Sequence, residues 1–153
     1  MIRRAKPEEA GYLSNLALRS KAHWGYDPVF LKAARVDLTL KPEDITANLI
    51  FVIEEQNEIL GFYGLYPKED NAVELECLFV EERIIGGGYG KKLWQHAIQT
   101  AREQGFEQMF INSDPHTEDF YYAMGAIRIG QSESAIMPGR MLPLMQFNLV
   151  EEK

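Results

Sequence analysis

The chain has 153 residues, 46% of them hydrophobic, which suits one ordinary globular domain spanning residues 1–153. Its formal net charge of −7 argues against nucleic acid or an anionic membrane as the main partner, because both bind basic surfaces. An acidic balance would favour a cationic small molecule instead. The longest strongly apolar run, Leu49–Ile53, is too short to cross a bilayer, and the single cysteine allows no internal disulfide, so we expect a cytoplasmic protein.

The first half of the chain predicts a strand, two helices and a hairpin. Pro7 opens a helix because its ring fits the first helical position, and Asp27 caps a second helix that begins at Pro28. Two β-branched and aromatic runs joined by Gln56 and Asn57 are typical of a hairpin. The predicted elements are a strand at Met1–Ala5, helices beginning at Pro7 and Pro28, and strands at Leu49–Glu55 and Glu58–Tyr66.

The second half predicts four more strands and two more helices. Apolar residues at helical spacing predict a helix over Gly88–Gln104 that ends at Gly105, and a short helix begins at Asp114 and ends before Gly125. Because a helix crosses over between them, the strands on either side of the longer helix are expected to be parallel. The predicted strands are Ala72–Val80, Phe106–Ile111, Ala126–Gly130 and Leu144–Glu151. The sequence therefore predicts an α+β fold, a mixed sheet of about seven strands flanked by four helices.

A glycine-rich loop, Gly86-Gly87-Gly88-Tyr89-Gly90, joins the fourth strand to the long helix. Each glycine inside a regular element costs about 0.5–1 kcal/mol relative to alanine, so this loop is expected to need bare backbone. The first N–H groups of a helix lack helical acceptors and attract anions, so the loop predicts an anion site, with a ligand-free turn as the alternative. Nucleotide motifs fail, because Lys91 occupies the last glycine position of the dinucleotide fingerprint and Ile85 the first glycine position of the Walker pattern.

The loop from Ile85 to Gly90 resembles the acyl-CoA loop of the GNAT acetyltransferases, [QR]-x-x-G-x-[GA], with Ile85 in place of Gln or Arg. The segment Asp114–Ala126 is similar to the N-A-x-x-F-Y-x-x-x-G-F segment of that family. The order of elements resembles the family over essentially the whole chain. This resemblance implies the GNAT fold and an N-acetyltransferase that transfers an acetyl group from acetyl-CoA to a primary amine by direct attack in a ternary complex. The alternative is a non-catalytic module that senses acyl-CoA, and the fold also leaves a homodimer through the last strands as an option.

The resemblance places the cosubstrate against the glycine loop and the strand before it, with Arg83 and Lys92 as further positive charges. Asn112, at the end of the fifth strand, is either a ligand of the pantetheine amide or a simple turn residue. The expected cofactor-binding residues are Leu78, Phe79, Val80, Ile85, Gly86, Gly87, Gly88, Tyr89, Gly90, Lys91, Asn112 and Phe120.

Proton transfer during acyl transfer to an amine needs a base and an acid. Glu74 and Glu76 are both candidates for the base, since a carboxylate about 20 Å back along the strand from the loop lies within reach of an extended pantetheine arm. Tyr121 matches the tyrosine that returns a proton to the thiolate in the resembled family. The alternatives are exposed strand acids and an ordinary core tyrosine. Regular alternation would put Glu74, Glu76, Leu78 and Val80 on one face of the strand and Leu75, Cys77 and Phe79 on the other.

The link between the first two helices overhangs the amine pocket in the resembled family, which makes the segment Lys21–Tyr26 the candidate for acceptor binding, through His23, Trp24 and Tyr26. Arg140, before the last strand, is a further candidate. A surface loop and an exposed arginine are the alternatives. Cys77 is interpreted as a buried structural thiol. The three histidines lack metal-ligand spacing, His96 being assigned to the polar face of its helix, so no metal is expected.

Overall fold

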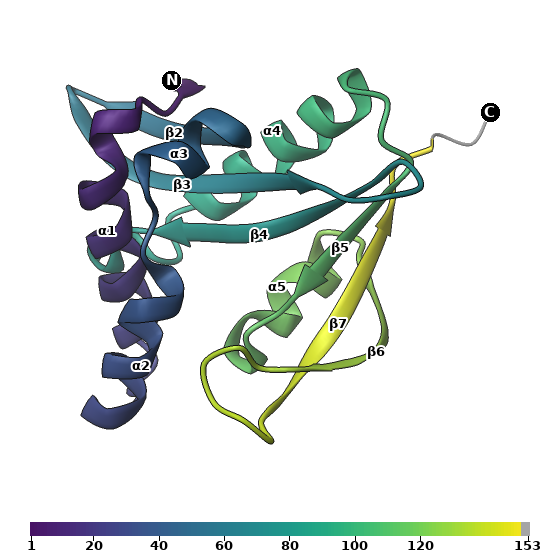
Figure 1. The fold of residues 1–153 in the computed structure, drawn as a ribbon. Helices are drawn as coiled ribbons and strands as arrows, with labels where there is room; N and C mark the ends of the chain where they lie inside the picture. The colour runs from purple at the N-terminus through teal and green to yellow at the C-terminus, as the bar shows by residue number, and fades with distance from the viewer. Residues whose placement is uncertain (151–153) are drawn as a thin grey trace.

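The computed structural model describes residues 1–150, whose seven strands form one mixed sheet in the order β1-β2-β3-β4-β5-β7-β6 (Figure 1). All neighbouring strands are antiparallel except β4 and β5, which are parallel. The predicted class and the parallel pair are therefore confirmed, while the predicted end of the last strand at Glu151 lies outside the described residues. The strands are β1 (Ile2–Arg4), β2 (Leu49–Glu55), β3 (Glu58–Pro67), β4 (Ala72–Val80), β5 (Gln108–Asn112), β6 (Ile127–Glu133) and β7 (Met141–Asn148).

Five α-helices occur in the described residues, one more than predicted. The additional helix, α3, has Pro42 at its first position, and the carboxylate of Asp44 accepts a hydrogen bond from the Lys41 amide at 2.8 Å. At six residues α3 is too short to show a helical repeat in the sequence. The helices are α1 (Ala10–Ala22), α2 (Pro28–Leu38), α3 (Pro42–Ala47), α4 (Tyr89–Glu103) and α5 (Glu118–Ala123), with 3-10 turns η1 (Pro7–Glu9), η2 (Glu82–Ile84) and η3 (Pro115–Thr117). Within residues 1–150, every helix is too short or too polar to cross a bilayer.

Helices cover both faces of the sheet. One core cluster joins α4 to the sheet through Leu93, Trp94 and Ala97, and a second joins α1 and α3 to the opposite face through Leu13, Leu16 and Ile45. Figure 1 shows α1 and α2 side by side at one end of the sheet, with α4 on the other face. The apolar stripes of these helices bury against the sheet, which fixes where their ends lie.

His96 does not follow the predicted polar face of α4. Its ring is partly buried, and its Nδ1 atom lies 2.7 Å from the hydroxyl of Tyr63, which is fully buried in the core. Burial lowers the pKa of His96. The prediction was wrong because the long Tyr63 side chain reaches the flank of α4 from β3 and supplies a polar partner there, a contact that helical spacing does not reveal.

A β-bulge in β4 breaks the regular alternation expected from the sequence. Gly64 of β3 pairs with Cys77 and the next residue, Leu65, pairs with Leu75, so Glu76 has no partner of its own. Leu75 packs in the core cluster under α4, whereas Cys77 packs against the cluster under α1. The prediction that Leu75, Cys77 and Phe79 share one face is therefore wrong, because the extra residue shifts the side chains that follow it.

The parallel strands β4 and β5 pair over only three residues each. Ala72–Glu74 pairs with Gln108–Phe110, and beyond this short ladder the two strands separate in a V (Figure 1). Because the remainder of β4 pairs only with β3, one edge of Leu75–Val80 keeps backbone N–H and C=O groups that no strand of residues 1–150 bonds. The separation exposes a polar backbone edge in the middle of the sheet.

Candidate active site

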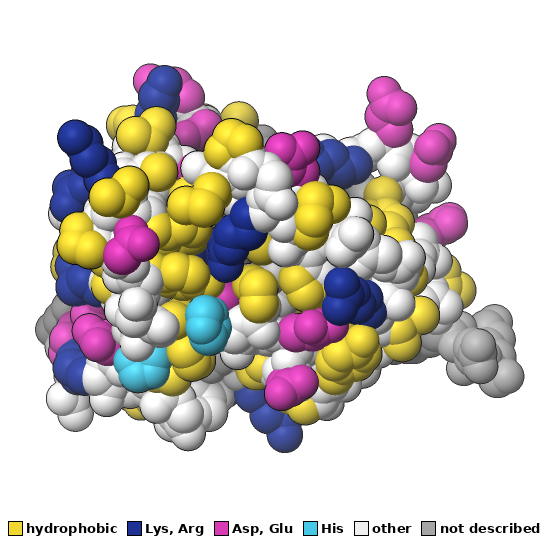
Figure 2. Space-filling model, turned by 90° about the horizontal axis from the view of Figure 1, so that it is seen from below, with side chains coloured by type: hydrophobic (Ala, Val, Ile, Leu, Met, Phe, Trp, Pro, Cys, Tyr) yellow, Lys and Arg dark blue, Asp and Glu magenta, His cyan; other side chains and the backbone are white. Residues whose placement is uncertain are grey.

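A cleft of about 590 Å³ lies where β4 and β5 separate, within the size range of small-molecule sites. Its walls come from β4, the glycine loop, the ends of β5 and α1, α5 and the loop between β6 and β7. On the face seen from below, hydrophobic side chains gather with basic, acidic and histidine side chains among them (Figure 2). The predicted site residues that line the cleft are Trp24, Glu74, Glu76, Leu78, Phe79, Val80, Ile85, Gly86, Gly88, Gly90, Lys91, Asn112, Phe120, Tyr121 and Arg140.

The glycine loop lines this cleft and contains amides without hydrogen-bond partners. Gly86 and Gly88 have φ angles of +90° and +88°, a conformation that side chains with a Cβ rarely adopt. The first helical bond of α4 runs from the Lys92 amide to the Gly88 carbonyl at 3.2 Å. The amides of Gly86 and of Gly88 through Lys91 make no hydrogen bond to another described residue. Such a row of free donors at a helix N-terminus fits the diphosphate of an acyl-CoA.

Of the basic residues near the loop, only Lys91 lines the cleft. Arg83 forms an ion pair with Glu58 of β3, so its charge is already compensated. The ammonium of Lys92 lies over the ring of Tyr89, 5.1 Å from its centroid. The expected extra charge at the loop is therefore supplied by Lys91, while Arg83 and Lys92 face elsewhere.

Three predicted cofactor-binding residues contribute backbone or packing rather than polar side chains. The Tyr89 hydroxyl bonds to Glu55, outside the cleft, and Gly87 likewise does not line it. Phe120 packs against the start of α4, where a Cβ on Gly90 would lie 3.4 Å from its ring. Gly90 thus lets α5 approach the helix N-terminus closely.

The structure gives the two candidate bases different surroundings. Glu74 accepts a hydrogen bond from the Asn112 amide at 2.8 Å and forms an ion pair with Lys68 at 3.2 Å. Asn112 in turn accepts a bond from the Ser132 hydroxyl at 2.6 Å, so both ends of its amide are occupied. Glu76, in the bulge, is exposed and makes no hydrogen bond or ion pair with another described residue, and partial desolvation of its carboxylate and the charge of Glu74 raise its pKa. Glu76 therefore has both a free carboxylate and a raised proton affinity.

Tyr121 is buried, with only 6% of its surface exposed, and its ring packs against Trp94 and Phe120. Its hydroxyl makes no hydrogen bond to another residue of the described chain, although the residue lines the cleft. Burial raises the pKa of this hydroxyl, so it stays protonated at neutral pH. The neighbouring Tyr122 is 47% exposed and lies outside the cleft. Tyr121 therefore lines the cleft with a neutral hydroxyl that has no protein partner in the described chain.

Cys77 also lines the cleft, but its sulfur is a protonated thiol rather than a reactive thiolate. Burial raises the pKa of the Cys77 sulfur far above neutral pH, with the charge of Glu76 acting in the same direction. The thiolate needed for a covalent acyl-enzyme is thus disfavoured. Among residues 1–150 no three His, Cys, Asp or Glu side chains are arranged to hold a metal ion.

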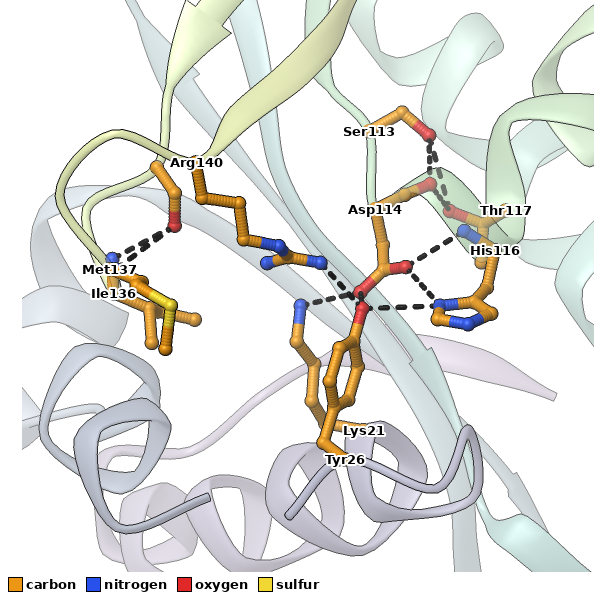
Figure 3. Close-up of polar contacts among 10 residues, drawn as sticks. Lys21, Tyr26, Ser113, Asp114, His116, Thr117, Ile136, Met137 and Arg140 are labelled. Carbon is orange, nitrogen blue, oxygen red and sulfur yellow. Dashed lines mark hydrogen bonds and ion pairs between the residues drawn. The ribbon is translucent and has the colours of Figure 1, made fainter. Parts of the chain in front are cut away.

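The opposite side of the cleft contains a charged cluster of Lys21, Tyr26, Asp114, His116 and Arg140 (Figure 3). The Tyr26 hydroxyl accepts a bond from Nη2 of Arg140 at 2.6 Å and donates one to Oδ2 of Asp114 at 2.7 Å. The Lys21 ammonium lies 2.8 Å from the same Oδ2, and Nδ1 of His116 lies 2.8 Å from Oδ1. Because these residues come from α1, the α1–α2 link, the end of β5 and the β6–β7 loop, the cluster connects the two halves of the molecule across the V.

Electrostatics within the cluster follow from its burial. Burial alone would raise the pKa of Asp114, but the Lys21 charge beside it, the His116 amide and the Tyr26 hydroxyl hold that pKa well below its usual value. Burial and the bond to Asp114 raise the pKa of Tyr26 to about 12. Asp114 is therefore ionised and Tyr26 neutral at physiological pH.

The sequence predicted part of this acceptor side. Trp24 lines the cleft and stacks on His116 with 5.2 Å between ring centroids. Tyr26 supports Arg140 from just outside the cleft, and His23 lies away from it, 3.6 Å from Glu82. Lys21 begins the predicted acceptor segment, whereas Asp114 and His116 were missed as site residues. The Asp-Pro pair at positions 114–115 signalled only a helix start, which the structure also shows, since Asp114 caps η3.

A model of the acetyltransferase (GNAT) family matches residues 16–126. An amino-acid acetyltransferase of Shewanella oneidensis is 29% identical over 110 residues, which are 71% of this chain and 23% of that protein. The N-acetyltransferase YjgM of Escherichia coli is 32% identical over 66 residues, 41% of this chain and 40% of that protein. The chain thus spans less than half the length of each of these relatives.

Solved structures resemble the fold over nearly the whole chain. The PaiA N-acetyltransferase of Thermoplasma acidophilum, crystallised in complex with coenzyme A, superimposes with a TM-score of 0.77 at 17% sequence identity, covering 97% of this chain and 98% of that one. At this identity the likeness establishes the fold.

Proposed function

Because the chain belongs to the acetyltransferase (GNAT) family, we propose that it transfers an acetyl group from acetyl-CoA to a primary amine while both are bound in the cleft. The observation that carries this proposal is the set of unpaired amides at Gly86 and Gly88 through Lys91, in a loop with two glycines at positive φ that lines the cleft between β4 and β5. The coenzyme A complex of the Thermoplasma protein, which has the same fold, supports a coenzyme A ligand.

The residues of the cleft fit the two ends of that ligand. The loop amides and Lys91 would hold the diphosphate, and the open edge of β4 near Leu78 and Val80 would bond the amides of the pantetheine arm. When bound, acetyl-CoA supplies an acetyl thioester, whose transfer to an amine yields an amide and a free thiol.

Two side chains are suited to move the protons of this reaction. Glu76 has a free carboxylate with a raised pKa, so we assign it the proton lost by the amine. Tyr121 has an unpartnered, protonated hydroxyl, so we assign it the proton delivered to the departing sulfur. Glu74, fixed between Asn112 and Lys68, is assigned a positioning and electrostatic role instead. Both glutamates were candidates from the sequence. Glu76 is favoured because its carboxylate is free, whereas that of Glu74 is bonded to Asn112 and paired with Lys68.

The test compares Glu76→Gln with Glu74→Gln in a thiol-release assay with acetyl-CoA and a panel of amines. Loss of a general base typically costs about 10²- to 10⁴-fold, so kcat/KM should fall by that much for Glu76→Gln and less for Glu74→Gln, with coenzyme A affinity unchanged in both. In the wild type, kcat/KM should fall as pH drops through the raised pKa of Glu76. A greater loss for Glu74→Gln would reverse the assignment. Tight coenzyme A binding without thiol release for any amine would point to the sensing module.

The names of the relatives do not settle the acceptor. The Shewanella relative is named an amino-acid acetyltransferase, but the match covers only 23% of that protein. The acceptor must therefore be inferred from the cleft itself.

A further inference from the structure

The acceptor side of the cleft holds two cations and one bonded carboxylate. The Lys21 ammonium and the Arg140 guanidinium both lie over the stacked rings of Tyr26 and Phe30, between 4.9 and 5.9 Å from the ring centroids. Lys21 pairs with Asp114, whereas the side chain of Arg140 bonds only to the neutral hydroxyl of Tyr26 within the described residues. Within the five residues of this cluster, Asp114 compensates Lys21 and no carboxylate pairs with Arg140, although Glu133 also lines the cleft.

The cation without a carboxylate partner in this cluster is Arg140. Its Nη1 atom is buried and has no hydrogen-bond partner among the described residues, the one side-chain atom there in this condition. A buried charged donor without a partner is costly, and native proteins rarely leave one. Glu133, which also lines the cleft, is already bonded to the amide of Gly139 at 3.0 Å. Nη1 thus has no hydrogen-bond partner among the described residues, and Arg140 lines the cleft in which the amine is proposed to bind.

We propose that the acceptor is an amine that also carries a carboxylate, as an amino acid does, and that the guanidinium of Arg140 turns its unpaired nitrogen to this carboxylate when the acceptor binds, with Lys21 as a second donor. This inference rests on the acetyltransferase function proposed above. Guanidinium groups bind carboxylates through charge-assisted hydrogen bonds, and one uncompensated charge matches a monoanion better than a doubly charged phosphate. At another part of the cleft, the free carboxylate of Glu76 supplies the opposite charge for the ammonium end. A cleft lined by both a guanidinium and a free carboxylate is complementary to a zwitterion.

The experiment uses matched ligand pairs and a binding readout that does not depend on turnover. Each of the twenty L-amino acids and its C-terminal amide is titrated calorimetrically into the full chain saturated with coenzyme A, and the same pairs are assayed for thiol release with acetyl-CoA. Phosphoethanolamine and ethanolamine form a further pair that tests for phosphate. We expect at least one amino acid to bind more tightly than its amide. Amides that bind as well as the acids, or a preference confined to phosphoethanolamine, would overturn the proposal.

Arg140→Gln tests the residue, with Arg128→Gln, an exposed arginine of β6 outside the cleft, as the matched control. Charged hydrogen bonds are worth about 1.5–3 kcal/mol, so Arg140→Gln should weaken binding of the amino acid roughly 10- to 100-fold and leave its amide and coenzyme A unaffected. Arg140→Lys should recover part of the loss. An equal loss for acid and amide would refute a carboxylate contact. If an amino acid binds in a manner that depends on Arg140 but no thiol is released, the acetyltransferase function is contradicted and the carboxylate site is supported. If amines are acetylated whether or not they carry a carboxylate, the acetyltransferase function is supported and the carboxylate site is contradicted.

Discussion

Gly88→Ala is the substitution that most directly tests the role of the glycine loop. Gly88 is the N-cap of α4, with a φ angle of +88°, and no protein atom lies within 4 Å of the position a Cβ would take. The cost of alanine is therefore backbone strain rather than a clash. For a residue with a Cβ, the left-handed conformation costs about 1–2 kcal/mol.

That strain must appear in stability, in binding, or in both. If the loop keeps its conformation, the free protein is destabilised by about 1–2 kcal/mol, which lowers Tm by roughly 2–8 °C in a chain of this size. If the loop relaxes to another conformation instead, its amides move away from the positions that bind the ligand. Returning the loop to the binding conformation then costs the same free energy, which weakens coenzyme A binding about 5- to 30-fold. Because Gly88 lines the cleft, the added methyl group also meets the ligand, so we expect a loss of affinity in either case.

Gly105→Ala is the matched control, since Gly105 has a φ angle of +84°, is equally free of contacts, and lies beyond the opposite end of the same helix. The assay is calorimetric titration of coenzyme A together with thermal unfolding of both variants. Both variants should be destabilised by up to about 2 kcal/mol, but only Gly88→Ala should bind coenzyme A more weakly. Wild-type affinity in Gly88→Ala, or an equal loss in Gly105→Ala, would refute the inference that the loop amides hold the ligand.

Three further outcomes are expected. Tyr121→Phe should lower kcat about 10²-fold and leave the coenzyme A Kd unchanged, whereas unaltered turnover at every pH would remove its role as acid. Gly61→Ala should lower the free energy of unfolding in urea by roughly 1–3 kcal/mol, because its Cβ would lie 2.7 Å from the Phe79 carbonyl oxygen, while Gly130→Ala, with open space around it, should not. The folded-state pKa of Asp114 lies below its usual 3.8, so the stability it adds is present above that pH and is lost as pH falls further. Asp114→Asn should cost about 3 kcal/mol at neutral pH and flatten this acid dependence of unfolding, and an unchanged pH profile would contradict it.

The features predicted correctly are those that depend on the spacing of residues close together in the sequence. Seven strands, the crossover helix over Tyr89–Glu103 and the glycine loop before it follow from periodicity and from glycine spacing, because strand pleat and helix pitch repeat within a few residues. The bulge at Glu76 and the short helix α3 did not follow, since a bulge is defined by pairing with another strand and six residues show no helical period. The same limit explains the mistaken position of His96, whose partner lies on β3.

By itself the sequence determined the fold class, the glycine loop and the residue types available for proton transfer, because each depends on neighbours within about one turn of chain. Only the tertiary structure separated Glu76 from Glu74, by giving one glutamate partners and leaving the other free. Only the tertiary structure also brought Lys21, Asp114 and Arg140 together and left one guanidinium nitrogen unpaired. Charge balance inside a cleft depends on which distant segments meet there, and that is set by packing across the whole sheet rather than by the order of residues along the chain.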